Sequence, residues 1–143
     1  MIQNPEIILG RSYQDERGKL TFVNDFNLSE IKRYYIIEHT DINIIRAWQG
    51  HKMEQKWFQV ISGSFLVAVV KPDNWENPSF DIQIERFILK SDNTQVLHIP
   101  GGFANGFKAL ETNSKMIVFS DLTLEEAAND NFRFDSNLWF DWK

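Results

Sequence analysis

The sequence contains no cysteine in its 143 residues. This absence excludes disulfide scaffolds, thiolate metal sites and thiol nucleophiles. Long apolar runs are missing too, since no stretch approaches the ~18 consecutive apolar residues of a transmembrane helix. The start Met-Ile-Gln-Asn-Pro lacks the basic and apolar regions of a secretory signal. We therefore expect no membrane span, no signal peptide and a cytoplasmic location.

Positive charge is also scarce. Lysine and arginine number 15 against 20 aspartate and glutamate, which gives a formal net charge of −5. Nucleic-acid binding depends on a basic surface that neutralises phosphates, so we expect no nucleic-acid partner. A small anionic ligand remains open wherever a few arginines converge.

Aromatic residues are plentiful, with 12 Phe, 5 Trp and 3 Tyr within a hydrophobic fraction of 43%. A chain of this length can bury one well-packed core but not two. We therefore predict a single domain over residues 1–143, with no linker and no internal repeat.

Short β-type runs separated by turn residues predict an all-β sandwich or barrel. Ser62-Gly63-Ser64 is the strongest hairpin signal, and Pro100-Gly101-Gly102 forms a second sharp turn. The expected strands are Ile7–Leu9, Leu20–Val23, Arg33–Glu38, Asn43–Trp48, Trp57–Ile61, Phe65–Lys71, Asp81–Leu89, Gln95–Ile99, Gly106–Leu110 and Met116–Asp121.

Helix is expected only near the C-terminus. Thr123 and Glu126 have the spacing of a capping box and predict a helix of about two turns. The aromatic tail Phe132–Trp142 suits a segment that lies back over the barrel or on a second subunit.

Two stretches, Arg46–Lys52 and Ile99–Phe107, resemble the paired motifs of the cupin superfamily, whose fold is a jelly-roll β-barrel. In metal-binding cupins the two motifs supply histidines and a carboxylate that meet inside the barrel. Here those positions carry Gln49, His51, Gln55 and Asn105. One imidazole and three amides form a poor ligand set for a first-row metal, so we expect no metal.

Three segments in order resemble the nucleotide-sugar branch of that superfamily. Asp15–Leu20 is similar to the Asp-x-Arg-Gly opening of dTDP-4-dehydrorhamnose 3,5-epimerases and dTDP-hexose 3,4-ketoisomerases. Ile31–Ile37 followed by Arg46 resembles the Lys-Arg-x-Tyr-Tyr segment and Arg-Gly-x-His-x-His motif of the ketoisomerases. Ile99–Phe107 resembles an epimerase motif. The resemblance covers nearly the whole chain and implies a homodimer with exchanged strands.

The resemblance also shows two departures. The family's catalytic base is the first histidine after the Arg-Gly pair, and here that position is Gln49, which does not titrate near neutral pH. A second family histidine is replaced by Asn105. His51 matches the second histidine of the ketoisomerase motif, and we predict it as a lone base with Tyr35 as the acid.

For binding, the resemblance implies that Arg17 and Arg46 contact the diphosphate and sugar, with Lys52 and Lys56 assisting. Gln49 and Asn105 would orient sugar oxygens. Trp48 is a candidate for stacking on the ligand but fits the core equally well. From the residues alone, Arg46 has the alternative of an ion pair with Glu54.

The leading hypothesis is an isomerase that acts on a dTDP-linked 4-keto-6-deoxyhexose in deoxysugar or surface-polysaccharide biosynthesis. It would use cofactor-free proton transfer beside the keto group. The alternative is a non-catalytic sugar-nucleotide or carbohydrate-binding cupin that has lost its base, which Gln49 favours and His51 opposes.

Overall fold

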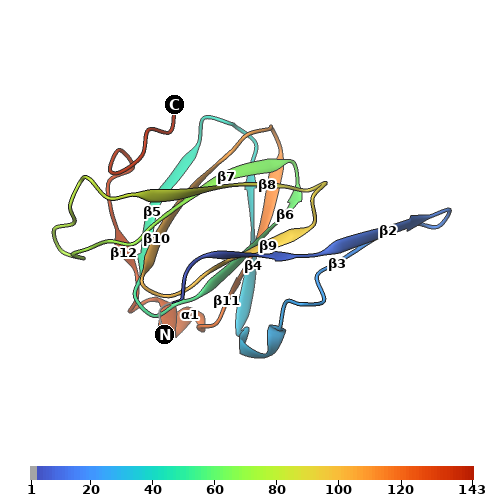
Figure 1. The fold of residues 1–143 in the computed structure, drawn as a ribbon, viewed down its shortest axis with the longest axis horizontal. Helices are drawn as coiled ribbons and strands as arrows, with labels where there is room; N and C mark the ends of the chain where they lie inside the picture. The colour runs from blue at the N-terminus through green and yellow to red at the C-terminus, as the bar shows by residue number, and fades with distance from the viewer. Residues whose placement is uncertain (1–2) are drawn as a thin grey trace.

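A computed structural model describes residues 3–143, which form two five-stranded antiparallel sheets packed face to face (Figure 1). The first sheet has the strand order β1-β9-β6-β11-β4, and the second has the order β12-β5-β10-β7-β8. Strands distant in sequence lie side by side in both sheets, as in a jelly roll. The predicted all-β cupin fold is confirmed.

All ten predicted strands are present, with ends that differ from the prediction by up to three residues, and β2 and β12 are additional. The first sheet contains β1 (Glu6–Leu9), β4 (Arg33–His39), β6 (Lys56–Ser62), β9 (Gln95–Ile99) and β11 (Ser114–Ser120). The second contains β5 (Ile45–His51), β7 (Ser64–Val70), β8 (Ile84–Lys90), β10 (Phe103–Ala109) and the short β12 (Phe132–Arg133). A separate hairpin consists of β2 (Arg11–Asp15) and β3 (Gly18–Phe22).

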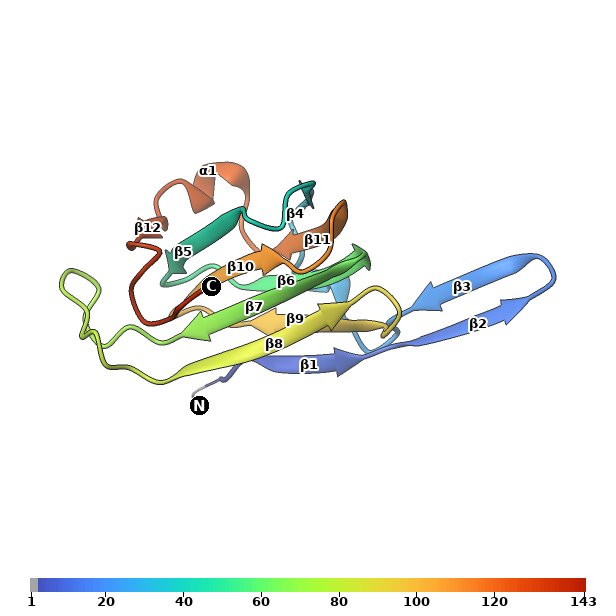
Figure 2. The same cartoon turned by 90° about the horizontal axis from the view of Figure 1, so that it is seen from above.

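The β2–β3 hairpin extends away from the two sheets, and within residues 3–143 its strands pair only with each other (Figure 2). β2 was not predicted, because its sequence Arg-Ser-Tyr-Gln-Asp has one large apolar residue and no buried face. Tyr13 of β2 and Leu20 of β3 are cross-strand partners and are both exposed.

Local turn and cap chemistry behaves as the sequence indicates. β6 and β7 are joined at Gly63, which has a φ of +72° that a glycine adopts without steric cost. Thr123 and Glu126 form the predicted capping box, but α1 (Leu124–Ala127) is a single turn and not two. A 3₁₀ turn, η1, spans Leu28–Glu30.

Two apolar clusters lie on opposite faces of the second sheet. The main core fills the space between the sheets and is centred on Phe58, Phe65 and Phe107. The second cluster lies outside, where Trp48 and its neighbours pack against Trp139 and Trp142 of the tail. The aromatic tail therefore lies back over its own chain, which is the first of the two alternatives expected for it.

Candidate functional site

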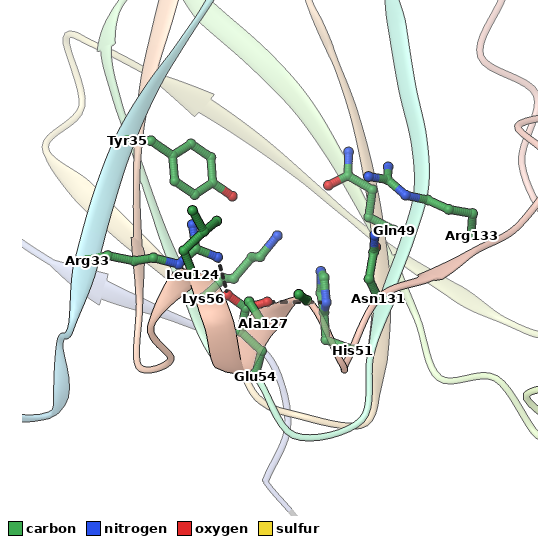
Figure 3. Close-up of a pocket in the computed structure, with 11 residues that line it drawn as sticks. Arg33, Tyr35, Gln49, His51, Glu54, Lys56, Leu124, Ala127, Asn131 and Arg133 are labelled. Atoms are coloured by element: carbon green, nitrogen blue, oxygen red, sulfur yellow. Dashed lines mark hydrogen bonds and ion pairs between the residues drawn. The ribbon is translucent and has the colours of Figure 1, made fainter.

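A cavity of about 290 Å³ opens between the two sheets, beside α1 (Figure 3). β4 contributes Arg33 and Tyr35, and β5 contributes Gln49 and His51. The cavity is lined by Arg33, Tyr35, Gln49, His51, Glu54, Lys56, Leu124, Ala127, Ala128, Asn131 and Arg133. The structure thus brings together four sequence-predicted residues, His51, Tyr35, Gln49 and Lys56.

The period of two along a strand explains why these pairs face inward. Arg33 and Tyr35 are two residues apart on β4, and Gln49 and His51 are two apart on β5. The residues between or before them, such as Trp48, therefore face the other side of the sheet. Arg33 and Tyr35 extend toward the cavity from the opposite sheet to His51 (Figure 3).

His51 is buried and is fixed through one ring nitrogen. Its Nδ1 lies 2.7 Å from the main-chain oxygen of Asp130 and 3.2 Å from a carboxylate oxygen of Glu54. A carbonyl oxygen only accepts hydrogen bonds, so Nδ1 must carry the proton and donate it. Nε2 of His51 has no hydrogen-bond partner within residues 3–143. The imidazole therefore presents an unshared electron pair, as a general base requires.

Burial is the largest influence on the pKa of His51 and lowers it below the ordinary value of 6.5, and the positive charge of Lys56 lowers it further. The hydrogen bond to Asp130 and the charge of Glu54 oppose this change. The imidazole is therefore neutral near pH 7 and available to accept a proton.

Glu54 is the only carboxylate among the lining residues, and it is almost fully buried. It accepts hydrogen bonds from Ser120 and from Arg33, whose Nη2 lies 2.9 Å away. The alternative ion pair between Arg46 and Glu54 is therefore wrong. Arg46 instead donates from Nε to Nε2 of His39 over 3.1 Å. The two residues are close because β4 ends at His39 and Arg46 is the second residue of β5.

Lys56 is buried on β6, and its pKa is lowered to about 8, first by burial and then by the charges of Arg33 and Arg133. Glu54 opposes this change. Arg33, Lys56 and Arg133 line the cavity against one carboxylate, so the cavity is positive although the chain carries a net charge of −5. Such a site suits an anionic ligand or an oxyanion that forms during a reaction.

The phenol of Tyr35 has a raised pKa, mainly because it is buried and secondly because of the charge of Glu54. Arg33 and Arg46 act in the opposite direction. The hydroxyl therefore keeps its proton at neutral pH and is able to donate it, which is what an acid partner for His51 needs.

Five other predicted residues lie outside the lining. Arg17 is at the exposed tip of the β2–β3 hairpin, where it pairs with Asp15. Asn105 lies on β10, where it is buried and is the cross-strand partner of Gln49 on β5. Its Oδ1 has no hydrogen-bond partner within residues 3–143. Arg46 is exposed on β5.

Trp48 and Lys52 also lie away from the cavity. Trp48 is buried on the outer face of β5, where its Nε1 donates to the carbonyl of Leu138. The sheet pleat places it there, opposite to its neighbour Gln49. The ammonium group of Lys52 lies over the rings of Trp75 and Phe132.

The sequence analysis did not assign Arg33, Asn131 and Arg133 to the site, and it gave Glu54 another role, as a partner of Arg46. Arg33 carried a usable signal, because it alternates with Tyr35 on one strand. Asn131 and Arg133 had none, since they follow α1 and reach the cavity only through the fold. No group of three or more His, Cys, Asp or Glu side chains that could hold a metal ion occurs within residues 3–143.

No helix in residues 3–143 is long and apolar enough to cross a membrane. The jelly-roll sandwich with a polar cavity between its sheets is a cupin-type fold. A family model described as dTDP-4-dehydrorhamnose 3,5-epimerase matches residues 2–143, so the chain belongs to the dTDP-4-dehydrorhamnose 3,5-epimerase family. The predicted similarity to the nucleotide-sugar isomerase group is thereby confirmed.

Individual relatives agree with this family. The chain is 28% identical over 110 residues to a probable low-salt glycan biosynthesis epimerase of Haloferax volcanii, covering 73% of this chain and 68% of the relative. It resembles the TDP-quinovose 3,4-ketoisomerase of Campylobacter jejuni with 25% identity and a TM-score of 0.72, over 93% and 95% of the two chains. A dTDP sugar isomerase of Desulfovibrio desulfuricans shares the fold with 19% identity and a TM-score of 0.80, over 99% and 92%.

Proposed function

We propose that this chain isomerises a dTDP-linked 4-keto-6-deoxyhexose, by moving a proton on a carbon beside the keto group, in deoxysugar or surface-polysaccharide biosynthesis. The observation that carries the proposal is the free Nε2 of buried His51 in a cation-lined cavity, with the phenol of Tyr35 on the opposite sheet. The family and the similar ketoisomerase support the substrate class.

In the proposed reaction His51 takes the proton from the carbon next to the keto group. The electron pair of the broken C–H bond forms an enolate, whose negative charge lies on the former keto oxygen. Lys56 and Arg33 supply positive charge in the same cavity, where the low exposure to water strengthens their effect. Gln49 lies beside His51 and would hydrogen-bond a sugar oxygen.

The return of the proton decides the product. Delivery by Tyr35 to the opposite face of the same carbon would give an epimer, after which the proton held by His51 returns to the Tyr35 oxygen through solvent. To move the keto group, the hydroxyl proton on the deprotonated carbon passes to the enolate oxygen, and His51 returns its proton to the former keto carbon. Both routes then end with as many protons and electrons as they begin with. Tyr35 and His51 approach from different sheets, which favours delivery to the opposite face.

The diphosphate would lie at the mouth of the cavity. A cavity of about 290 Å³ has room for a hexose but not for the attached nucleotide. Arg133 is exposed at the lining, and Arg46 is exposed on β5 close enough to influence the pKa of Tyr35. Guanidinium groups there match phosphate oxygens.

We propose a homodimer in which the β2–β3 hairpin of each copy packs on the other. An isolated two-stranded hairpin is marginally stable in water, and here Tyr13 and Leu20 remain 59% and 63% exposed. Packing on a second copy would cover both residues and carry Arg17, at the tip, toward the partner's cavity. We also propose a cytoplasmic location, as expected from the sequence.

Incubation with dTDP-4-keto-6-deoxyglucose tests the function. Product formation followed by proton NMR supports an isomerase, with the His51→Asn protein as the matched inactive control. Calorimetric binding of the sugar nucleotide without any product would instead support the non-catalytic binding module. Absence of both binding and product would overturn both hypotheses, the isomerase and the non-catalytic binding module.

A further inference from the structure

Asp130, in the link between α1 and β12, contacts the turn that follows β5 through its whole carboxylate. Its Oδ1 accepts from the main-chain N–H of Lys52 at 2.7 Å. Its Oδ2 accepts from Met53 at 2.8 Å and from Glu54 at 2.7 Å. Three consecutive N–H donors to one carboxylate of a residue that is only 6% exposed form a strong, geometrically defined contact.

The same residue also holds His51 directly. The main-chain oxygen of Asp130 lies 2.7 Å from Nδ1 of His51, and the second acceptor near that nitrogen is the carboxylate of Glu54 at 3.2 Å. Because the main-chain N–H of Glu54 is bonded to Asp130, both acceptors of Nδ1 depend on where Asp130 lies.

We infer that Asp130 is a positioning residue for proton transfer, which holds the proton of His51 on Nδ1 and keeps the Nε2 electron pair toward the cavity. The role in proton transfer rests on the proposed function, whereas the position of the proton on His51 does not. Besides the carboxylate of Asp130 itself, the charged and titratable groups around His51 come from four places, namely Glu54 of the turn, Lys56 of β6, Arg33 and Tyr35 of β4, and Arg133 of β12.

Asp130→Asn is the informative substitution, because asparagine keeps the size of the side chain but replaces an acceptor oxygen with a donor. One of the three N–H groups then loses its partner, and the turn and the Asp130 carbonyl are free to shift. Asp135→Asn is the matched control, since Asp135 is exposed in the same tail and its carboxylate accepts, among residues 3–143, only the local N–H of Asn137.

Nitrogen-15 NMR of histidine in the unliganded protein provides a readout that a purely structural role would not change. In the wild type we expect His51 to carry its neutral proton on Nδ1. In Asp130→Asn we expect a larger share of the Nε2–H form and a lower pKa, because the Asp130 hydrogen bond and charge both raise the pKa of His51. Asp135→Asn should match the wild type.

The activity readout is separate. With the sugar nucleotide, Asp130→Asn should lower kcat by about tenfold and leave KM within about twofold, because it disturbs the base and not the binding groups. The inference is overturned if wild-type His51 carries its proton on Nε2, a result that needs no variant. It is also overturned if folded Asp130→Asn keeps the wild-type tautomer and pKa. An inactive wild-type protein, combined with the expected tautomer change in Asp130→Asn, would refute the proposed function alone.

Discussion

Nδ1 of His51 donates a hydrogen bond to the main-chain oxygen of Asp130 over 2.7 Å. This contact determines which side of the imidazole is basic, because the proton on Nδ1 leaves the electron pair on Nε2. A histidine held in this way can accept a proton from a ligand in the cavity even though the neighbouring position, Gln49, cannot titrate.

The pH dependence of kcat/KM should be bell-shaped. The lowered pKa of His51 places the acid limb below pH 6.5, since the neutral ring is the active form. The alkaline limb should lie near pH 8, where Lys56 loses the charge that stabilises the enolate. In Lys56→Arg the alkaline limb should move upward, because arginine stays protonated. An acid limb above pH 7 would contradict the role given to His51.

Arg133→Gln should weaken binding of the dTDP-sugar by about tenfold, which corresponds to the loss of one charge-assisted phosphate contact. Titration calorimetry at low and high salt measures this loss, and the effect should shrink at high salt. Arg86→Gln is the matched control, because Arg86 is exposed on β8 and does not line the cavity. Equal effects of the two substitutions would show that only overall charge matters.

Arg17 should act across the dimer. Arg17→Ala and His51→Asn subunits should each be nearly inactive alone, but a mixed dimer contains one site with both an intact His51 and the partner copy's Arg17. Random mixing should restore about a quarter of wild-type activity, given one intact site in half of the dimers. Mixtures without recovered activity would place Arg17 outside the partner's site, and a monomer in sedimentation would refute the dimer.

Lys56→Met should stabilise the protein by about 1–3 kcal/mol at pH 7, because burial of the charged ammonium opposes folding. The lowered pKa means that the unfolded chain binds this proton more tightly. Wild-type stability should therefore rise as the pH increases from about 8 to 10.5, and the advantage of Lys56→Met should decline over that range. Urea unfolding at pH 7 and 9.5 measures both values. A constant difference would contradict the buried charge.

Local sequence signals predicted most of the fold. The Gly63 turn and the Thr123 capping box depend on residues within a few positions of one another, so their geometry can be read directly from the chain. β2 escaped prediction because an exposed hairpin has no alternation of buried and exposed residues. The resemblance to the family motifs pointed to His51, Gln49 and Tyr35, and all three line the cavity.

The rest of the site depends on contacts between residues distant in sequence. Asp130 lies 79 residues after His51, and no local pattern connects the two. The partner of Glu54 illustrates the same limit, because sequence offers several arginines and only the strand register selects Arg33 over Arg46. Trp48 shows that a motif neighbour can face the opposite side of a sheet.

Deuterium incorporation tests the central claim most directly. The wild type, His51→Asn and Gln49→Asn are each incubated with dTDP-4-keto-6-deoxyglucose in deuterated water, and label at the carbons beside the keto group is followed by NMR. We predict that the wild type incorporates deuterium, that Gln49→Asn retains most of this exchange, and that His51→Asn loses at least about 100-fold while still binding the sugar nucleotide. Wild-type exchange that survives unchanged in His51→Asn would contradict the account.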